Sequence, residues 1–484
     1  MKKAIVMFLL PAAVLAGCGT ADRPAREQGT VAWSKCTDLI DQEGKPITTG
    51  RGVECGTIKV PLDHAKPDGE KIDLALIRVK ATTRDRLGSL VFNFGGPGAS
   101  GVDSMAQMAQ LFGTLGMSYD LVSFDPRGVE RSAGVKCGSR LDKFLGAGPE
   151  ADAERLAKEY VAACQKDSGK VLPYVGTVNA AKDLDLLRIA LGDKKLDYFG
   201  ISYGTHLGAV YATQFPENVG RFVLDSPIDP KVGSAEFTVT QVEGFHQSFK
   251  AFAKDCVAQG CDLGADLATV ERKVVTLFDG IRAKPMKVGD RRLTYGLAQL
   301  GFITPLYSKE GWPSLEQGLA MAIKGDGRLL LAFADSYTGR KADGTYTTAM
   351  TSQQAIDCAD TTERLTAAEV ARTTERVKKI FSPLAAEDSS LPPCAHWPFR
   401  GDDAAEHIDA SGSGPIVVIG TKGDPATPYK WSTRFVDQLK TGVLLTYEGE
   451  GHSAYSTGNE CIKRTVDSYL MDGKLPARST SCAA

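Results

Sequence analysis

Short apolar runs alternate with helix-like stretches along the first half of the chain. The runs predict strands at residues 89–94, 119–124, 196–199 and 221–224. Residues 72–80 alternate apolar and polar side chains, as an early edge strand does. Leucine and isoleucine recur at near-helical spacing in residues 180–191, which predicts a helix before the third run. Strands that alternate with helices are typical of a mostly parallel sheet with helices on both faces.

The pattern changes at about residue 230. Residues 245–252, 270–281 and 315–323 are aromatic and helix-like, with glycine and proline breaks and few β-branched runs between them. Two short buried-type strands return at residues 415–420 and 443–447. We therefore expect a core domain in two parts, residues 33–229 and 401–484, with a mostly helical cap at residues 230–400 inserted between them.

The N-terminus has the zones of an export signal. Two lysines are followed by the apolar residues 4–15 and then by Ala16-Gly17-Cys18. The apolar run is too short to span a membrane as a helix. Residues 15–18 resemble a bacterial lipobox, so residues 1–17 are predicted to be a signal peptide and Cys18 a lipidated first residue. Residues 18–32 would then form the lipidated N-terminus and a polar tether. The alternative is an ordinary secretory signal with an incidental cysteine.

The cysteine count supports export independently. The chain has 11 cysteines, and an even set is left when Cys18 is set aside. In an oxidising compartment such a set indicates disulfides, and pairing in chain order joins nearby segments. That order predicts the pairs 36–55, 137–164, 256–261, 358–394 and 461–482. Zinc is the competing explanation, but no C-x₂-C motif with a second matching half is present, so no metal is predicted.

The charge of the chain excludes two classes of partner. It carries 57 basic and 59 acidic residues, well mixed, for a net charge of -2. A nucleic-acid-binding protein needs a basic face, and an anionic membrane surface selects a polybasic stripe. We expect neither partner, and a lipid on Cys18 would be the contact with the membrane.

The most informative motif is Gly200-Ile201-Ser202-Tyr203-Gly204, between a predicted strand and the helix-like residues 205–212. A strand, a tight turn with a central serine, and a helix form the nucleophile elbow of an α/β-hydrolase. Glycines two positions either side of the serine are needed because a Cβ there would collide with the crossing chain. A plain Gly/Ser surface turn is the alternative. The fold predicted from this motif is an α/β-hydrolase with an inserted cap.

A serine nucleophile needs an imidazole base and a carboxylate that orients it. In this fold the chain order is serine, acid, histidine. His452 follows the predicted strand at residues 443–447, and Asp424 follows the strand at residues 415–420. Catalytic groups of open α/β sheets gather at the carboxyl ends of the strands. Ser202, Asp424 and His452 are therefore the predicted catalytic triad.

The oxyanion hole of this fold uses the N–H after the nucleophile and a second N–H from an early loop. These would be Tyr203 and Gly96, the latter in Gly95-Gly96-Pro97-Gly98. A structural turn or a phosphate loop is the alternative for this glycine loop. The Gly95–Gly98 loop lacks the Lys-Ser/Thr of a P-loop and the glycine spacing of a dinucleotide-binding fingerprint. No cofactor is therefore predicted.

Several motifs together resemble the secreted tripeptidyl aminopeptidase family of bacterial α/β-hydrolases, which is related to prolyl aminopeptidases. They lie at residues 93–101, 125–128, 183–188, 200–205, 225–227 and 424–428. The resemblance extends from about Trp33 to Cys482. It implies a capped serine exopeptidase that acts on peptide N-termini. Glu130 departs from the family pattern, which has glycine there, and this puts the local loop geometry in question.

The sequence thus predicts a serine peptidase that releases short peptides, tripeptides by the resemblance, from peptide N-termini. A carboxylic ester hydrolase with the same triad is one alternative, and a lipoprotein that binds peptides without cleaving them is another. An exopeptidase also needs a carboxylate for the substrate's free α-ammonium, since a buried unpaired cation is unfavourable. Glu236 and Glu243 of the cap are the candidates for that role.

Overall fold

The computed structural model describes residues 30–37, 39, 47, 50, 52–138, 140–146, 152–387 and 390–484. The predicted signal peptide, Cys18 and most of the tether lie outside the described residues. Among the described helices, none is both long and apolar enough to cross a membrane.

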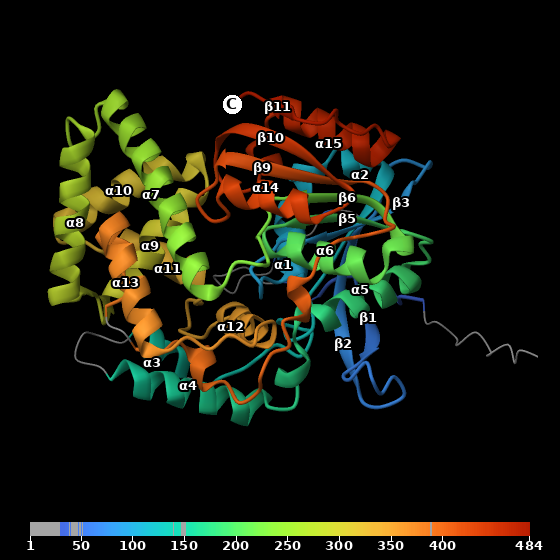
Figure 1. Cartoon of the computed structure of the whole chain (residues 1–484), viewed down its shortest axis with the longest axis horizontal. Helices are drawn as coiled ribbons and strands as arrows, with labels where there is room; N and C mark the ends of the chain where they lie inside the picture. The colour runs from blue at the N-terminus through green and yellow to red at the C-terminus, as the bar shows by residue number, and fades with distance from the viewer. Residues whose placement is uncertain are drawn as a thin grey trace, which may run out of the picture.

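A nine-stranded sheet forms the centre of the core domain (Figure 1). Its strands, in spatial order, are β1 (Val53–Pro61), β2 (Lys71–Val79), β4 (Tyr119–Phe124), β3 (Gly88–Asn93), β5 (Leu196–Ile201), β6 (Val219–Asp225), β9 (Ile416–Gly423), β10 (Gly442–Glu450) and β11 (Thr480–Cys482). β1 and β2 are antiparallel to their neighbours and the remaining strands are parallel. The predicted strands are present, but the edge position expected for residues 72–80 is wrong. β1 pairs outside β2 and takes the edge.

Alternate side chains of the strands enter separate cores on the two faces. Val91 of β3 packs into one core, while Leu90 and Phe92 pack into the other. The first face is covered by α5 (Thr177–Leu191), α6 (Tyr203–Gln214) and α14 (Tyr429–Gln438). The second is covered by α1 (Gly101–Met108), α2 (Leu115–Ser118) and α15 (Glu460–Asp472). This layering confirms the α/β-hydrolase fold.

A third core lies in the cap, apart from the sheet. The helices that build it gather on the left of Figure 1: α7 (Ser234–Gln259), α8 (Leu267–Ala283), α9 (Tyr295–Ile303), α10 (Trp312–Ile323), α11 (Arg328–Thr338) and α13 (Ala367–Phe381). A short hairpin, β7 (Met286–Val288) and β8 (Arg291–Leu293), joins α8 to α9. The cap thus has aromatic packing of its own, centred on Phe249, Phe302 and Phe381.

One helix of the predicted cap range packs differently. α12 (Ala349–Ala359) buries Ala355, Ile356 and Cys358 in a core shared with the sheet. It packs on the short helical turns Leu172–Tyr174 and Pro393–His396 and lies in the lower half of Figure 1, as do α3 (Arg140–Leu145) and α4 (Ala153–Ser168). α12 thus falls within the predicted cap range but packs on the core domain. The limits of the cap at residues 230 and 400 stay a prediction.

All five predicted disulfides are present and confirmed. They join residues 36 to 55, 137 to 164, 256 to 261, 358 to 394 and 461 to 482. Each closes a loop of 5 to 36 residues. Local cross-links of this kind reduce the entropy of the unfolded chain.

Candidate active site

Ser202 lies on a sharp turn between β5 and α6. Its backbone has φ 56° and ψ -123°, a conformation that a residue with a side chain rarely adopts. The flanking glycines are required by close contacts. A Cβ on Gly200 would lie 2.3 Å from the Gly204 carbonyl oxygen, and one on Gly204 would lie 2.3 Å from the Asn93 carbonyl oxygen. The turn therefore holds the serine in a strained position at the carboxyl edge of the sheet.

His452 and Asp424 are brought together from the ends of β10 and β9. The Nδ1 atom of His452 lies 3.0 Å from each carboxylate oxygen of Asp424. Asp424 is almost fully buried and also accepts the backbone N–H groups of Ala426 and Thr427. The Thr427 hydroxyl donates to the same carboxylate at 3.0 Å. These bonds fix the carboxylate so that Nδ1–H donates to it, which leaves Nε2 as the proton acceptor.

The charge around His452 favours its protonated form. Burial alone would lower its pKa, but the charge of Asp424, the hydrogen bond from Nδ1 and the more distant charge of Asp225 raise the pKa overall. An imidazole with this environment is a stronger base than a free one, and it stabilises the imidazolium that forms when it takes a proton.

Asp225 positions the histidine loop without contacting the imidazole ring. Its buried carboxylate accepts the Ser453 hydroxyl at 2.8 Å and the N–H groups of Ala454 and Tyr455 at 3.1 and 3.0 Å. The Asp225 carbonyl accepts the N–H of Ser202 at 3.0 Å. One residue at the end of β6 thus ties the nucleophile turn to the loop that carries the base.

A cap residue contacts the base directly. The carbonyl of Tyr307 accepts the backbone N–H of His452 at 2.8 Å, and the two rings pack edge to face with centroids 5.5 Å apart. Tyr307 follows α9 in the cap. The sequence carried no signal for this contact, because nothing in the local pattern at residue 307 indicates which loop it faces.

The predicted oxyanion donors lie beside the nucleophile turn. The N–H of Tyr203 is at the first position of α6, where an N–H has no acceptor within the helix. A Cβ on Gly95 would lie 2.9 Å from the Ser202 Cβ, so the glycine loop approaches the serine closely. The Gly95 N–H is used by the Asn93 side chain at 3.0 Å. Gly96 as the second donor stays a prediction that these contacts support.

The two cap acids considered as amine receptors already have basic partners. Glu236 pairs with Arg376 at 2.7 Å and Glu243 with Lys430 at 2.8 Å. All four side chains are about half exposed. Because each carboxylate is already neutralised on an outer surface, neither is suited to hold a substrate ammonium.

Glu130 has a structural explanation. The family pattern has glycine at this position, and the φ of Glu130 is 36°, in the region that favours glycine. The Glu130 side chain accepts the N–H of Thr348 at the start of α12. The Thr348 hydroxyl in turn accepts the N–H of Glu130 at 2.8 Å. The strained backbone is offset by this reciprocal pair, which fastens α12 to the loop after β4.

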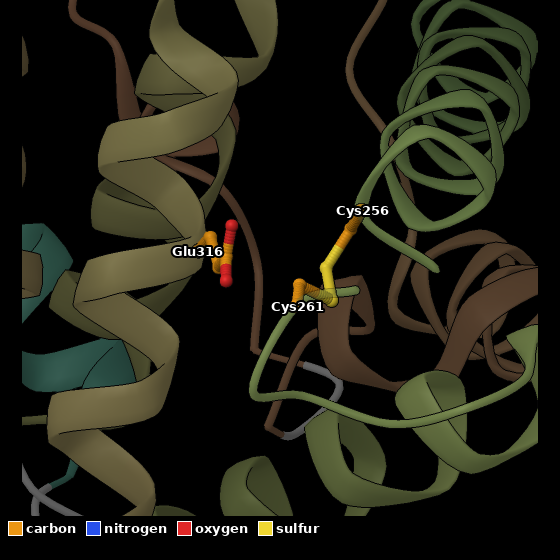
Figure 2. Close-up of side chains that lie close together, drawn as sticks. All are labelled: Cys256, Cys261 and Glu316. Atoms are coloured by element: carbon orange, nitrogen blue, oxygen red, sulfur yellow. A yellow bond between two sulfur atoms is a disulfide. The ribbon is translucent and has the colours of Figure 1, made fainter. Parts of the chain in front are cut away.

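One group in the cap has the spacing of a metal site. Cys256, Cys261 and Glu316 offer atoms within 4.8 Å of one another (Figure 2). The two sulfurs are joined as a disulfide, and Glu316 accepts the Asp262 N–H at 3.3 Å. A disulfide has no thiolate to offer a metal, so this group carries no metal-site proposal.

The sequence of this chain is similar to two family profiles and to several named proteins. The family profile described as alpha/beta hydrolase fold matches residues 88–315, and the profile described as TAP-like protein matches residues 379–482. The chain is 37% identical to Serine protease Hip1 of Mycobacterium tuberculosis, with 97% of this chain and 95% of that protein covered. It is 35% identical to Carboxylesterase B of the same species, with 93% and 90% covered. It is 31% identical to Tripeptidyl aminopeptidase of Streptomyces lividans, with 96% and 90% covered.

Proposed function

Because the chain belongs to the tripeptidyl aminopeptidase family of α/β-hydrolases, we propose that it is a serine peptidase that removes tripeptides from free peptide N-termini. The observation that carries this proposal is the buried Asp424–His452 pair, whose histidine lies on a loop that Asp225 ties to the strained turn at Ser202. That arrangement is the one that activates a serine hydroxyl for acyl transfer.

In the proposed reaction the Ser202 hydroxyl attacks the scissile carbonyl and His452 Nε2 takes its proton. The N–H groups of Tyr203 and Gly96 hold the oxyanion. When the C–N bond breaks, the imidazolium returns the proton to the leaving amine, and the released fragment acquires a new N-terminus. Water then attacks the acyl-enzyme with His452 as base, which frees the tripeptide as a carboxylic acid and restores Ser202.

Ester hydrolysis is a second candidate, and the relative named Carboxylesterase B favours it. The same triad cleaves both kinds of acyl group, so the walls of the site decide between them. The non-catalytic peptide-binding alternative is disfavoured, since a receptor that only binds has no need for strained backbone at a serine.

We expect the purified enzyme to cleave trialanyl p-nitroanilide with a kcat/KM at least ten times that for p-nitrophenyl butyrate. A peptide substrate can fill extended subsites and the ester cannot, and about 1.4 kcal/mol of extra transition-state binding gives this factor. Mass spectrometry of products from longer peptides should show losses in steps of three residues. Faster ester cleavage, with no peptide product, would contradict the peptidase proposal and support the esterase.

Export with a lipid anchor belongs to the same proposal. The five disulfides support an oxidising compartment. We expect Cys18→Ser to move the protein from the membrane fraction to the soluble exported fraction, with activity retained. Unchanged membrane association of this variant would rule out the Cys18 anchor.

A further inference from the structure

α12 carries the acidic residue Asp357 in its last turn. The helix packs directly on the predicted oxyanion loop, because a Cβ on Gly98 would lie 2.3 Å from the Ala349 carbonyl oxygen and 2.8 Å from the Gln353 N–H nitrogen. Asp357 lies one turn beyond Gln353 on the same helix. Its position is therefore set by the loop that flanks Ser202.

The helix is held rigidly in this place. Ser352 donates to the Gly128 carbonyl and Thr351 to the Val135 carbonyl, each at 2.6 Å. The disulfide from Cys358 to Cys394 fixes its last turn. Asp360, just beyond the helix, accepts the N–H and the hydroxyl of Thr177, at 2.7 and 2.5 Å. A side chain on α12 is thus presented to the site with little freedom of the backbone.

The charge of Asp357 acts on two tyrosines that adjoin the predicted triad. Burial raises the pKa of Tyr203 and of Tyr337, and the charge of Asp357 adds to both shifts, so its carboxylate lies within electrostatic range of both phenols. Tyr337 is hydrogen-bonded to Tyr307, with ring centroids 6.4 Å apart, and Tyr307 packs on His452. Tyr203 follows Ser202. Tyr203 is buried, whereas solvent can reach the other residues of this group: Ser202, His452, Tyr307, Tyr337 and Asp357.

Asp357 has no counter-charge of its own. Its charged neighbour is Asp360, a second carboxylate, and burial together with that neighbour raises the pKa of Asp357 to about 7. In the part of the chain that the structure describes, no hydrogen bond or ion pair engages Asp357, whereas Asp360 is satisfied by Thr177. A carboxylate that is exposed to solvent and has another carboxylate as its charged neighbour favours a cation.

We propose that Asp357 receives the free α-ammonium of the substrate's N-terminal residue, which makes this enzyme an exopeptidase. The inference rests on the proposed peptidase function. A peptide N-terminus supplies the positive charge that the carboxylate lacks, while an acetylated N-terminus or an internal segment supplies none. The aromatic rings of Tyr307 and Tyr337 would line the path between this carboxylate and the catalytic base.

The test compares trialanyl p-nitroanilide with its N-acetylated form. We expect the wild-type enzyme to prefer the free amine by about 30-fold or more in kcat/KM, since loss of one partner from a charge pair that the bound peptide shields from solvent has an effect of this size. Asp357→Asn keeps the size of the side chain but removes its charge. It should lose this preference because its kcat/KM on the free-amine substrate falls. Its rate on the acetylated substrate should stay within about threefold of wild type.

Glu236→Gln and Glu243→Gln are matched controls, because they remove cap carboxylates that have surface partners, and they should keep the wild-type preference. Labelling of Ser202 by a fluorophosphonate reports the triad separately. If Asp357→Asn labels normally and still prefers the free amine, the assignment of Asp357 is overturned while the peptidase proposal stands. If wild type labels but cleaves no peptide, the peptidase proposal and this inference both fail.

Asp357→Glu provides a second test if the amide variant does not fold. It keeps the negative charge and moves it by one methylene group. A reduced preference for the free amine, with the acetylated rate unchanged, supports the assignment. An equal loss on both substrates would show a structural role and overturn it.

Discussion

Ser202→Ala is expected to lower kcat for trialanyl p-nitroanilide by about 10⁶-fold, the scale on which loss of a triad serine acts in serine peptidases. The variant keeps the base and the oxyanion donors but has no atom to form the acyl-enzyme. Alanine is smaller than serine, and its methyl group fits the space already occupied by the serine Cβ beside Gly95. Folding should therefore be unchanged, and the loss should fall on chemistry.

The measurement is a progress curve of released nitroaniline, with a fluorophosphonate probe on the same sample. Ser234→Ala is the matched control, because Ser234 lies at the start of α7 and bonds Glu363, far along the chain from the turn. It should keep full activity and labelling. Activity of Ser202→Ala within tenfold of wild type would remove the serine mechanism altogether.

Asp424→Asn is expected to reduce kcat by about 10⁴-fold, because an amide in this place no longer holds the imidazole in the tautomer that accepts the serine proton. The amide nitrogen cannot accept the N–H groups of Ala426 and Thr427, so the side chain turns its oxygen toward them. Its NH₂ group then faces Nδ1, and the proton moves to Nε2, which can no longer act as the base.

The pH dependence of the same variant gives an independent readout. His452 must be neutral to take a proton, so wild-type kcat/KM should fall on acidification with a midpoint above the ordinary histidine value of about 6.5, because its pKa is raised. Loss of the Asp424 charge should move the residual acid limb to lower pH. A wild-type midpoint below 6.5 would contradict the charge relation between the two residues.

Asp229→Asn is the matched control for this prediction. Asp229 is also a buried aspartate, near the end of β6, but it pairs with Gln438 and lies beside Arg434. Its replacement should cost some stability and leave the pH profile in place. A similar loss of kcat in both variants would indicate that the Asp424 effect comes from misfolding.

The three residues of the predicted triad could be selected from the sequence because each lies at the end of a strand, and local patterns identify strands; their joint role stays a prediction. The turn at Ser202 has its glycines at fixed offsets, and Asp424 and His452 follow short apolar runs in the order that the fold uses. The disulfides were predictable for a similar reason, since every pair joins cysteines close in the chain. In contrast, the edge strand β1 was missed. Its formation depends on hydrogen bonds to another segment, β2, and the local sequence pattern does not report them.

The residues around the triad could not be found in the same way. Tyr307 meets His452 across 145 positions of the chain, and no periodicity reports such a contact. The role considered for Glu236 and Glu243 stays a prediction that the ion pairs with Arg376 and Lys430 disfavour, and the sequence does not show these pairs. No local pattern marks Asp357, and only the packing of its helix α12 on the glycine loop suggests a role for it.

The sequence by itself therefore determined the order of the elements, the turn at Ser202, the candidates for the catalytic acid and base, and the cross-links. All of these depend on local spacing, on backbone sterics at glycines and on the order of residues along the chain. The tertiary structure alone decided which cap face covers the site, which carboxylates are already paired and which one stays without a counter-charge. Those properties depend on burial and on the distances between charges, and both arise only when distant segments pack together.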